Sequence, residues 1–167
     1  PKSHQGHVCI LTVMDQFTKW AEAFSLKNQE AATIAKVLIE QVFSRFGIPK
    51  QILTDQGKNF ESKLFLELCH RMGIDKIRTT VYRPSTNGML ERFHRTLNSM
   101  IGKIIDENQR NWSDLVPYVM AAYRASEHSV TKYSPNFLMF GRECRAPIDL
   151  VLGVPEDPNM RLSPDEF

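Results

Sequence analysis

The sequence lacks the features that mark several large classes of protein. It has only three cysteines, and no two of them form a Cys-x-x-Cys pair: Cys9, Cys69 and Cys144. Single cysteines without regular spacing argue against a structural zinc site and are typical of reduced intracellular thiols. No apolar run approaches the roughly 20 residues of a transmembrane helix, and no secretory signal is visible. The chain begins at Pro1 rather than at a methionine, which favours a fragment or a processed piece.

An excess of charge of one sign is also missing. Lys and Arg together number 21 against 19 Asp and Glu, so the formal net charge is only +2. Without an overall basic footprint, any binding to nucleic acid must depend on local patches. The 42% of hydrophobic and 24% of charged residues are close to an ordinary globular protein, and 167 residues suit one domain with a substantial core.

Hydrophobic patterning predicts a mixed α/β domain. The β-branched run His7–Asp15 predicts a buried strand, and Trp20–Leu26 predicts its hairpin partner. Two further short strands are predicted at Gln51–Thr54 and within Ile74–Thr80. Four helices are predicted after the first one, at Ser62–Met72, Gly88–Asp106, Asn111–Ala125 and Ser134–Phe140. This order places strands beneath covering helices.

The first predicted helix follows Asn28, a residue that can cap it, and ends at Gly47. Its apolar stripe is Ile34, Leu38, Val42 and Phe46. A loop is predicted at Tyr82–Asn87, because Pro, Ser, Thr and Asn favour irregular backbone. Residues 1–142 are predicted to form the domain, and 143–167 a tail or linker toward a missing C-terminal domain.

Two carboxylates are the candidate metal ligands of the sequence. Asp55 directly follows a short apolar strand, and Glu91 lies in the first turns of the long helix, with 35 residues between them. Two carboxylates brought together repel each other unless a cation neutralises them, and Mg²⁺ or Mn²⁺ prefers such oxygen ligands. The residues therefore point to metal-assisted phosphoryl transfer. Taken alone, an Asp in a strand-end turn is more often a turn residue, and a Glu four residues before an Arg on a helix is more often half of a solvated ion pair.

Four longer segments together resemble the integrases of Gypsy-type retrotransposons and their retroviral relatives. They are TDQGKNF at 54–60, RTT-Y-RPSTNG-MLERFHRTL at 78–97, AAYRASEH at 121–128 and SPNFLMFGRE at 134–143. The resemblance extends over roughly His7 to Leu152, and the spacing of Asp55 and Glu91 matches the D,D-35-E pattern of that family. The extension well past Glu91 argues against a cellular ribonuclease H.

The resemblance implies a ribonuclease H-like fold, a mixed sheet flanked by helices. It also implies an enzyme of the nucleus that processes element DNA ends and joins them to host DNA with two Mg²⁺ or Mn²⁺ ions. DNA would be the partner, together with self-association of the full-length protein. Asp55 and Glu91 would be catalytic residues and metal ligands. The expected DNA contacts around the site are basic: Arg83, Arg92, Arg95 and Lys103.

Asp15 is the one upstream acid that could complete an Asp, Asp, Glu triad by eye, and we assign it to a turn instead. In the family, the first catalytic Asp lies in the first strand, ahead of a turn that runs into residues like those at 1–3. The run from Val8 to Met14 resembles the second strand, so the chain is expected to lack the first strand and its Asp. Asp15 then lies where the hairpin turns, a position that favours Asp.

The loop before the long helix departs from the family pattern. The family usually has Tyr-His-Pro-Gln, whereas this sequence has Tyr82, Arg83, Pro84 and Ser85. The change removes a polar pair at the border of the active site and adds a charge that can bind phosphate. It keeps open the alternative of a domesticated domain without catalysis, which binds DNA or another partner.

Overall fold

The computed structural model of the chain describes residues 1–78 and 84–145. The strands are β1 (Cys9–Met14), β2 (Ala21–Leu26), β3 (Gln51–Thr54) and β4 (Asp75–Arg78). The first helix runs through α1 (Ala31–Val37), the π-helical η1 (Leu38–Phe43) and α2 (Ser44–Phe46). The other helices are α3 (Lys63–Arg71), α4 (Pro84–Ile104), α5 (Trp112–Ala125) and α6 (Pro135–Phe140). The predicted order of strands and helices is confirmed.

The strands form two small sheets rather than one. β1 and β2 pair antiparallel, from Cys9 opposite Leu26 to Met14 opposite Ala21. β3 and β4 pair parallel, with Thr54 opposite Arg78 at their ends. Within residues 1–78 and 84–145, β1 pairs only with β2, and β3 only with β4. An incomplete sheet is what the sequence predicts, and the two outer edges of β1 and β3 carry backbone groups that another strand could pair.

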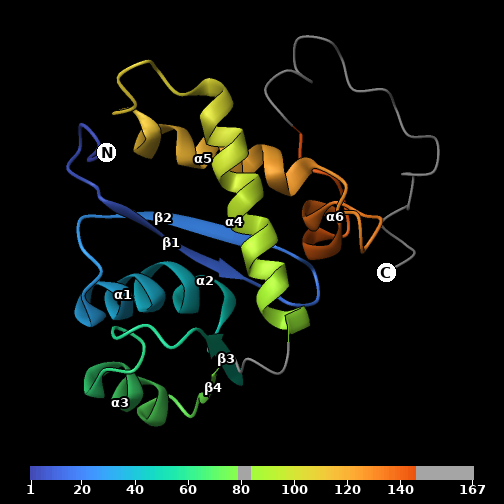
Figure 1. The fold of residues 1–167 in the computed structure, drawn as a ribbon. Coiled ribbons are helices and arrows are strands. Elements are labelled where there is room, and N and C mark those ends of the chain that lie inside the picture. Colours follow the sequence, from blue (N-terminus) through green and yellow to red (C-terminus); the bar gives the residue numbers. More distant parts are fainter. Residues whose placement is uncertain (79–83, 146–167) are drawn as a thin grey trace.

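The β1–β2 hairpin lies between two layers of helices (Figure 1). Successive strand residues point to opposite faces, so Leu11 joins one core and Ile10 packs against the other. The first core is formed chiefly by the β1–β2 hairpin, η1 and α3, and Ile52 of β3 packs against it. The second core joins the hairpin to α4 and α5 through residues that include Phe93, Leu97, Ile101, Trp112, Val116, Val119 and Met120. One hairpin thus positions both helical layers.

The π-helical segment η1 explains how the first helix keeps its apolar stripe. Ile34, Leu38 and Val42 recur every four residues and are all buried. An α-helix has 3.6 residues per turn, so a spacing of four rotates the stripe by about 40° at each step. The wider π turn takes up this rotation. Phe46, the last member of the predicted stripe, is 39% exposed and packs edge-on against Trp20 instead.

Three details of the predicted elements are wrong. Asn28 is not the capping residue: the helix begins after Glu30, and the Asn28 side chain accepts hydrogen bonds from the Glu30 amide and the Thr33 hydroxyl. The predicted loop Tyr82–Asn87 is helical from Pro84 onward, because the fixed φ of proline suits the first turn of a helix. Residues 82 and 83 lie outside the described part. Ile104, assigned to the α4 stripe, is 50% exposed because α4 ends there.

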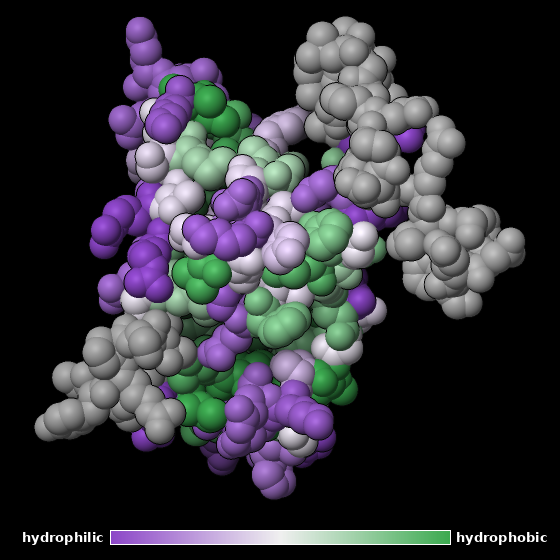
Figure 2. All heavy atoms as spheres, turned by 90° about the vertical axis from the view of Figure 1, so that its right-hand side faces the viewer, coloured by the Kyte–Doolittle hydropathy of each residue, from purple (hydrophilic) through white to green (hydrophobic). Residues whose placement is uncertain are grey.

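The surface mixes polar and apolar residues. Figure 2 views the side on which the β1–β2 turn and α6 lie in Figure 1, and hydrophilic and apolar residues alternate over it. In the described ranges, no helix is both long and apolar enough to span a membrane. Both tryptophans, Trp20 and Trp112, are buried core anchors rather than exposed stacking platforms.

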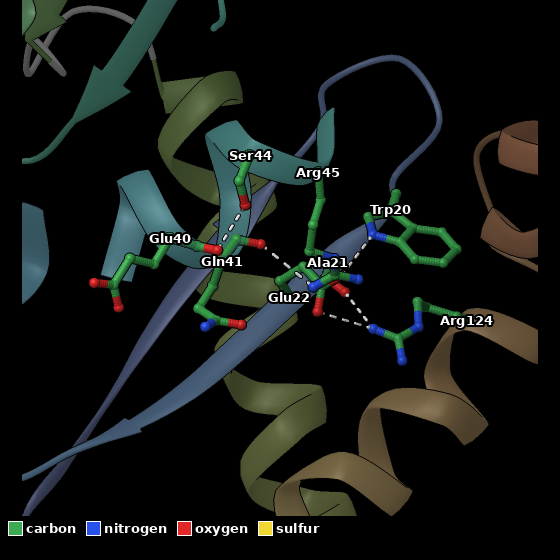
Figure 3. A network of polar contacts seen from close by, with 8 residues as sticks. All are labelled: Trp20, Ala21, Glu22, Glu40, Gln41, Ser44, Arg45 and Arg124. Carbon is green, nitrogen blue, oxygen red and sulfur yellow. Dashed lines mark hydrogen bonds and ion pairs between the residues drawn. The ribbon is translucent and has the colours of Figure 1, made fainter. Parts of the chain in front are cut away.

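A buried carboxylate connects the hairpin to two helices. Glu22 of β2 lies between Arg45 of α2 and Arg124 of α5, at N–O distances of 3.1 and 3.2 Å (Figure 3). The indole N–H of Trp20 donates to the same carboxylate at 3.2 Å, and the Arg124 guanidinium stacks over the Trp20 ring. Only 11% of the Glu22 side chain is exposed, so its charge depends on these donors rather than on water.

Candidate active site

Asp55 lies in the first loop position after β3, where the strand order predicts it. Its side-chain oxygen Oδ1 accepts the backbone N–H of Gly57 at 2.9 Å, and the carboxylate is exposed. A Cβ atom placed on Gly57 would lie 2.9 Å from that oxygen and 2.8 Å from Oδ1 of Asn59. A side chain at position 57 would therefore force the Asp55 or Asn59 side chain to shift, and glycine lets the Asp55 carboxylate fold back over the loop as it does. Within the described residues, the other Asp55 oxygen makes no hydrogen bond.

Glu61 holds the loop that carries Asp55 against β4. Its two carboxylate oxygens bind Lys76 and Arg78 at 2.6 Å each. These cations, Lys76 foremost, hold the pKa of Glu61 below its usual value. The start of α3 is fixed as well, because the Ser62 hydroxyl accepts the Phe65 N–H. The loop between β3 and α3 is therefore tied down on both sides, as a metal-binding loop must be.

Thr54, the last residue of β3, carries an unusual buried oxygen. Its hydroxyl is inaccessible to solvent and makes no hydrogen bond within the described residues. Burying a hydroxyl without a partner costs free energy, so such an atom marks a place where a partner is expected. It lies directly before Asp55, at the end of a strand whose outer edge is unpaired.

Glu91 is exposed on α4, on the side of that helix that meets β1. His94, one turn further along, hydrogen-bonds through Nε2 to the Thr12 hydroxyl of β1 at 2.6 Å. Residues three apart lie on the same side of a helix, so Glu91 shares this side. Phe93 and Leu97 of the same helix enter the core against the β1–β2 hairpin. His94 is exposed and is engaged by Thr12 at the edge of this contact.

Asp15 closes its own turn through one carboxylate oxygen. Its Oδ2 accepts hydrogen bonds from the Phe17 amide at 3.0 Å, the Thr18 amide at 2.7 Å and the Thr18 hydroxyl at 2.8 Å. These bonds close the β1–β2 hairpin, which is the turn role that the sequence reading assigns to it.

The described residues offer two candidate metal ligands rather than three. No group of three His, Cys, Asp or Glu side chains that could hold a metal occurs among them. Asp55 and Glu91 are hard oxygen donors of the kind that Mg²⁺ or Mn²⁺ takes, and one Asp55 oxygen makes no hydrogen bond in the part of the chain that the structure describes. The donor type fits a divalent cation, although the donor number does not complete a site. Their approach to each other stays a prediction.

The predicted DNA-binding residues that the structure describes all lie on one helix. Arg83 lies outside the described residues. Arg92, Arg95 and Lys103 are exposed on α4. At 100° per residue, Lys103 falls on nearly the same line as Arg92, whereas Arg95 falls closer to Glu91. All three fall within an arc of about 80° on the solvent side of α4, and the Arg92 guanidinium extends back toward Gly88.

Sequence reasoning did not single out Lys19 and His128, which lie outside α4. Lys19, in the hairpin turn, places its ammonium 3.3 Å from the sulfur of Met89 on α4. His128 follows α5, and Lys19 and Arg92 both act on it electrostatically. No spacing rule could have found them, because the three residues come from three separate elements.

Comparisons with known proteins agree with this geometry. Residues 1–84 match the family described as Integrase core domain. The chain is 31% identical over 147 residues to the retrovirus-related Pol polyprotein from transposon 412 of Drosophila melanogaster, covering 88% of the chain but only 12% of that polyprotein.

Solved structures of integrase catalytic cores are similar in fold. The catalytic core domain of BIV integrase superposes with a TM-score of 0.63 at 19% identity, covering 75% of this chain and 81% of that one. The HTLV-2 integrase catalytic core domain, solved in complex with magnesium in a trimeric form, gives 0.61 at 20% identity and covers 76% and 81%. The predicted ribonuclease H-like fold is confirmed.

Proposed function

Since the chain belongs to the integrase core domain family, we propose that it is the catalytic core of a retroelement integrase, which joins the ends of element DNA to host DNA. The observation that supports the proposal is the placement of each carboxylate: Asp55 is held over Gly57 directly after β3, and Glu91 is exposed on α4, one turn before His94, which bonds to β1. Divalent Mg²⁺ or Mn²⁺, when bound, would supply charge neutralisation of the reacting phosphodiester and its attacking hydroxyl.

The residues of the chain have separate tasks in this proposal. Asp55 and Glu91 would hold the cations, and Glu61 and Gly57 position the Asp55 loop. Arg95 and Lys103, with Arg83 and Arg92, would contact phosphates of DNA and so align it along α4. DNA is the partner, and self-association of the full-length protein and residence in the nucleus are part of the same proposal.

A third carboxylate is proposed to come from a strand supplied by residues ahead of Pro1 in the native protein. Two observations support it. The outer edges of β1 and β3 are unpaired in the described ranges, and both sheets cover the same core, so one more strand could join them. The Thr54 hydroxyl, buried without a partner beside Asp55, lies on one of the two strands with an open edge. The added strand would remove the exposed edges and stabilise the domain.

The experiment is a strand-transfer assay in Mg²⁺ or Mn²⁺ on two chains, the 167-residue chain and the same chain extended by its native upstream residues. We expect no transfer by the shorter chain and a higher melting temperature for the longer one. The longer chain should be active if the added strand carries an Asp, and Asp55→Asn should abolish that activity. Robust transfer by the shorter chain, lost on Asp15→Asn, would show that Asp15 is the first catalytic carboxylate after all.

A second candidate function is supported by the substitution in the loop before α4. Arg83 and Ser85 stand where the family usually has His and Gln, which favours a domesticated domain that binds DNA or another partner without catalysis. The upstream residues separate the two functions. A strand without an Asp, in a protein that binds DNA but transfers no strand, would favour the non-catalytic domain.

A further inference from the structure

The parallel strands β3 and β4 end side by side at the loop that carries Asp55. Thr54, the last residue of β3, is paired with Arg78, the last residue of β4. Neighbouring strands lie about 4.8 Å apart, and side chains alternate between the two faces of a sheet. Arg78 therefore lies beside the residue that directly precedes Asp55, at the edge of the candidate active site.

One carboxylate binds two cations at this end of β4. Glu61, in the loop before α3, lies 2.6 Å from the Lys76 ammonium and 2.6 Å from the Arg78 guanidinium. Within the described ranges, neither cation forms an ion pair with any other carboxylate, Asp55 included. Asp75, at the other end of β4, accepts a hydrogen bond from a glutamine of β3. These three charged groups therefore leave one positive charge in excess.

The two cations differ in how far they depend on Glu61. Only 6% of the Lys76 side chain is exposed, whereas 61% of the Arg78 side chain is. A buried ammonium without its counter-ion would stay uncompensated, so Lys76 needs Glu61. An exposed ion pair gains little over hydration, so Arg78 can share its charge with another anion at small cost. Glu61 remains neutralised by Lys76 in that case, and Arg78 is the surplus cation.

The Arg78 guanidinium also has donors that Glu61 does not use. A guanidinium has five N–H groups, and Arg78 donates from Nε at 3.2 Å and from Nη2 at 2.6 Å to the Glu61 carboxylate. Its Nη1 forms no hydrogen bond within residues 1–78 and 84–145. Paired N–H groups of arginine match the oxygens of a phosphate. One edge of the guanidinium can therefore bind a phosphate while the other edge stays on Glu61.

We propose that Arg78 binds a backbone phosphate of DNA beside the Asp55 loop, with its guanidinium oriented by Glu61. The inference rests on the proposed function, which makes DNA the partner. It extends the DNA contacts from α4 to the end of β4, a different element on the Asp55 side of the candidate site. A phosphate bound there anchors the DNA backbone close to the cation that Asp55 would hold.

The test is the salt dependence of binding to a DNA duplex, measured by fluorescence anisotropy without divalent cation on the chain extended by its native upstream residues. Each phosphate contact contributes about 0.9 to the slope of log affinity against log salt. We expect Arg78→Gln to reduce the slope by one such contribution and to weaken binding several-fold near physiological salt. Arg78→Lys keeps the charge and should keep most of the slope.

The matched control is Arg71→Gln. Arg71 is also an exposed arginine bound to a glutamate, Glu67, at 2.8 Å, but it lies at the opposite end of α3 from the Asp55 loop. Its removal should leave the slope unchanged. Melting temperatures of the three variants should stay close to that of the unaltered chain, since Lys76 still neutralises Glu61 when Arg78 is replaced.

The outcomes separate this inference from the proposed function. Arg95→Gln serves as the reference for contacts along α4. If Arg95→Gln lowers the slope while Arg78→Gln behaves like Arg71→Gln, Arg78 does not contact DNA and the proposed function stands. A loss of slope as large in Arg78→Lys as in Arg78→Gln would also overturn the phosphate contact, because the slope depends on charge. If the unaltered chain binds no DNA, both fail.

Discussion

We expect the substitution Glu22→Gln to lower the stability of the fold strongly, because it removes a buried charge. Glutamine keeps the shape of the side chain and removes its charge, so Arg45 and Arg124 lose their common counter-ion. Arg124 is the more affected, because only 18% of its side chain is exposed and it is also fixed to the Ala21 carbonyl at 3.2 Å. Arg45 is 47% exposed and can be rehydrated.

These exposures set the size of the effect. Removing one partner of a buried ion pair costs roughly 3–5 kcal/mol, and the partial exposure of Arg45 places Glu22→Gln at the lower end, about 3 kcal/mol. For a chain of this length, about 2–4 °C is lost per kcal/mol, so the melting temperature should fall by about 6–12 °C. Thermal unfolding followed by circular dichroism measures both quantities.

The matched control is Glu67→Gln, which removes an ion pair of similar geometry on the surface. Glu67 binds Arg71 at 2.8 Å, but the two side chains are 53% and 77% exposed. Exposed pairs contribute at most about 1 kcal/mol, so this variant should melt close to the original chain. If Glu22→Gln costs no more than Glu67→Gln, the Glu22 carboxylate is hydrated in solution, and its role in joining the hairpin to α2 and α5 is wrong.

The remaining predictions concern the Asp55 loop. Gly57→Ala should reduce strand transfer by the longer chain at least tenfold while leaving its fold intact, since the added carbon displaces the Asp55 carboxylate from 2.9 Å; near-normal rates would contradict this. Asp15→Asn should leave transfer measurable, whereas Asp55→Asn should abolish it, in parallel assays of the two variants. The pKa of Glu61 is lowered in the fold, so its stabilising effect is complete above its unfolded pKa of about 4.3 and is lost as the pH falls through the folded value. Melting curves between pH 3 and 7 should therefore show less acid destabilisation for Glu61→Gln than for the original chain.

Local sequence patterns predicted the strand ends, helix starts and hairpin turn, because contacts between residues close in the sequence determine them. The strand from Gln51 to Thr54 ends where the apolar run ends, so Asp55 could be placed at its end without coordinates. Ser62 and Ser134 cap α3 and α6, as expected of serine before an apolar run. The hairpin could be predicted as well, because Asp favours turns, and the Asp15 side chain closes this one.

The parts that sequence reasoning missed depend on contacts between distant segments. Glu22 has the appearance of a solvated residue on an alternating strand, yet its partners lie 23 and 102 positions away. Nothing in the pattern of β2 indicates that two arginines converge on it. The π-helical turn was missed for a different reason. Apolar residues spaced four apart still share one face of an α-helix over two turns. The rotation of this apolar stripe matters only once the position of the core that it must face is known.

The adjacent residues Glu91 and Arg92 show why the site could be predicted only in part. Consecutive residues of a helix point about 100° apart, so neighbours in the sequence serve different surfaces. Helix geometry sets this angle. The direction of each side chain depends on how α4 is rotated about its axis, and the sequence alone does not give that rotation. Phe93 and Leu97 set that rotation by entering the core. Given this rotation, His94, one turn beyond Glu91, reaches Thr12 of β1, and Met89 meets the Lys19 ammonium of the hairpin turn. A substitution of Phe93 that rotated α4 would therefore impair both surfaces together, whereas substitutions of Glu91 or Arg92 should affect only one each.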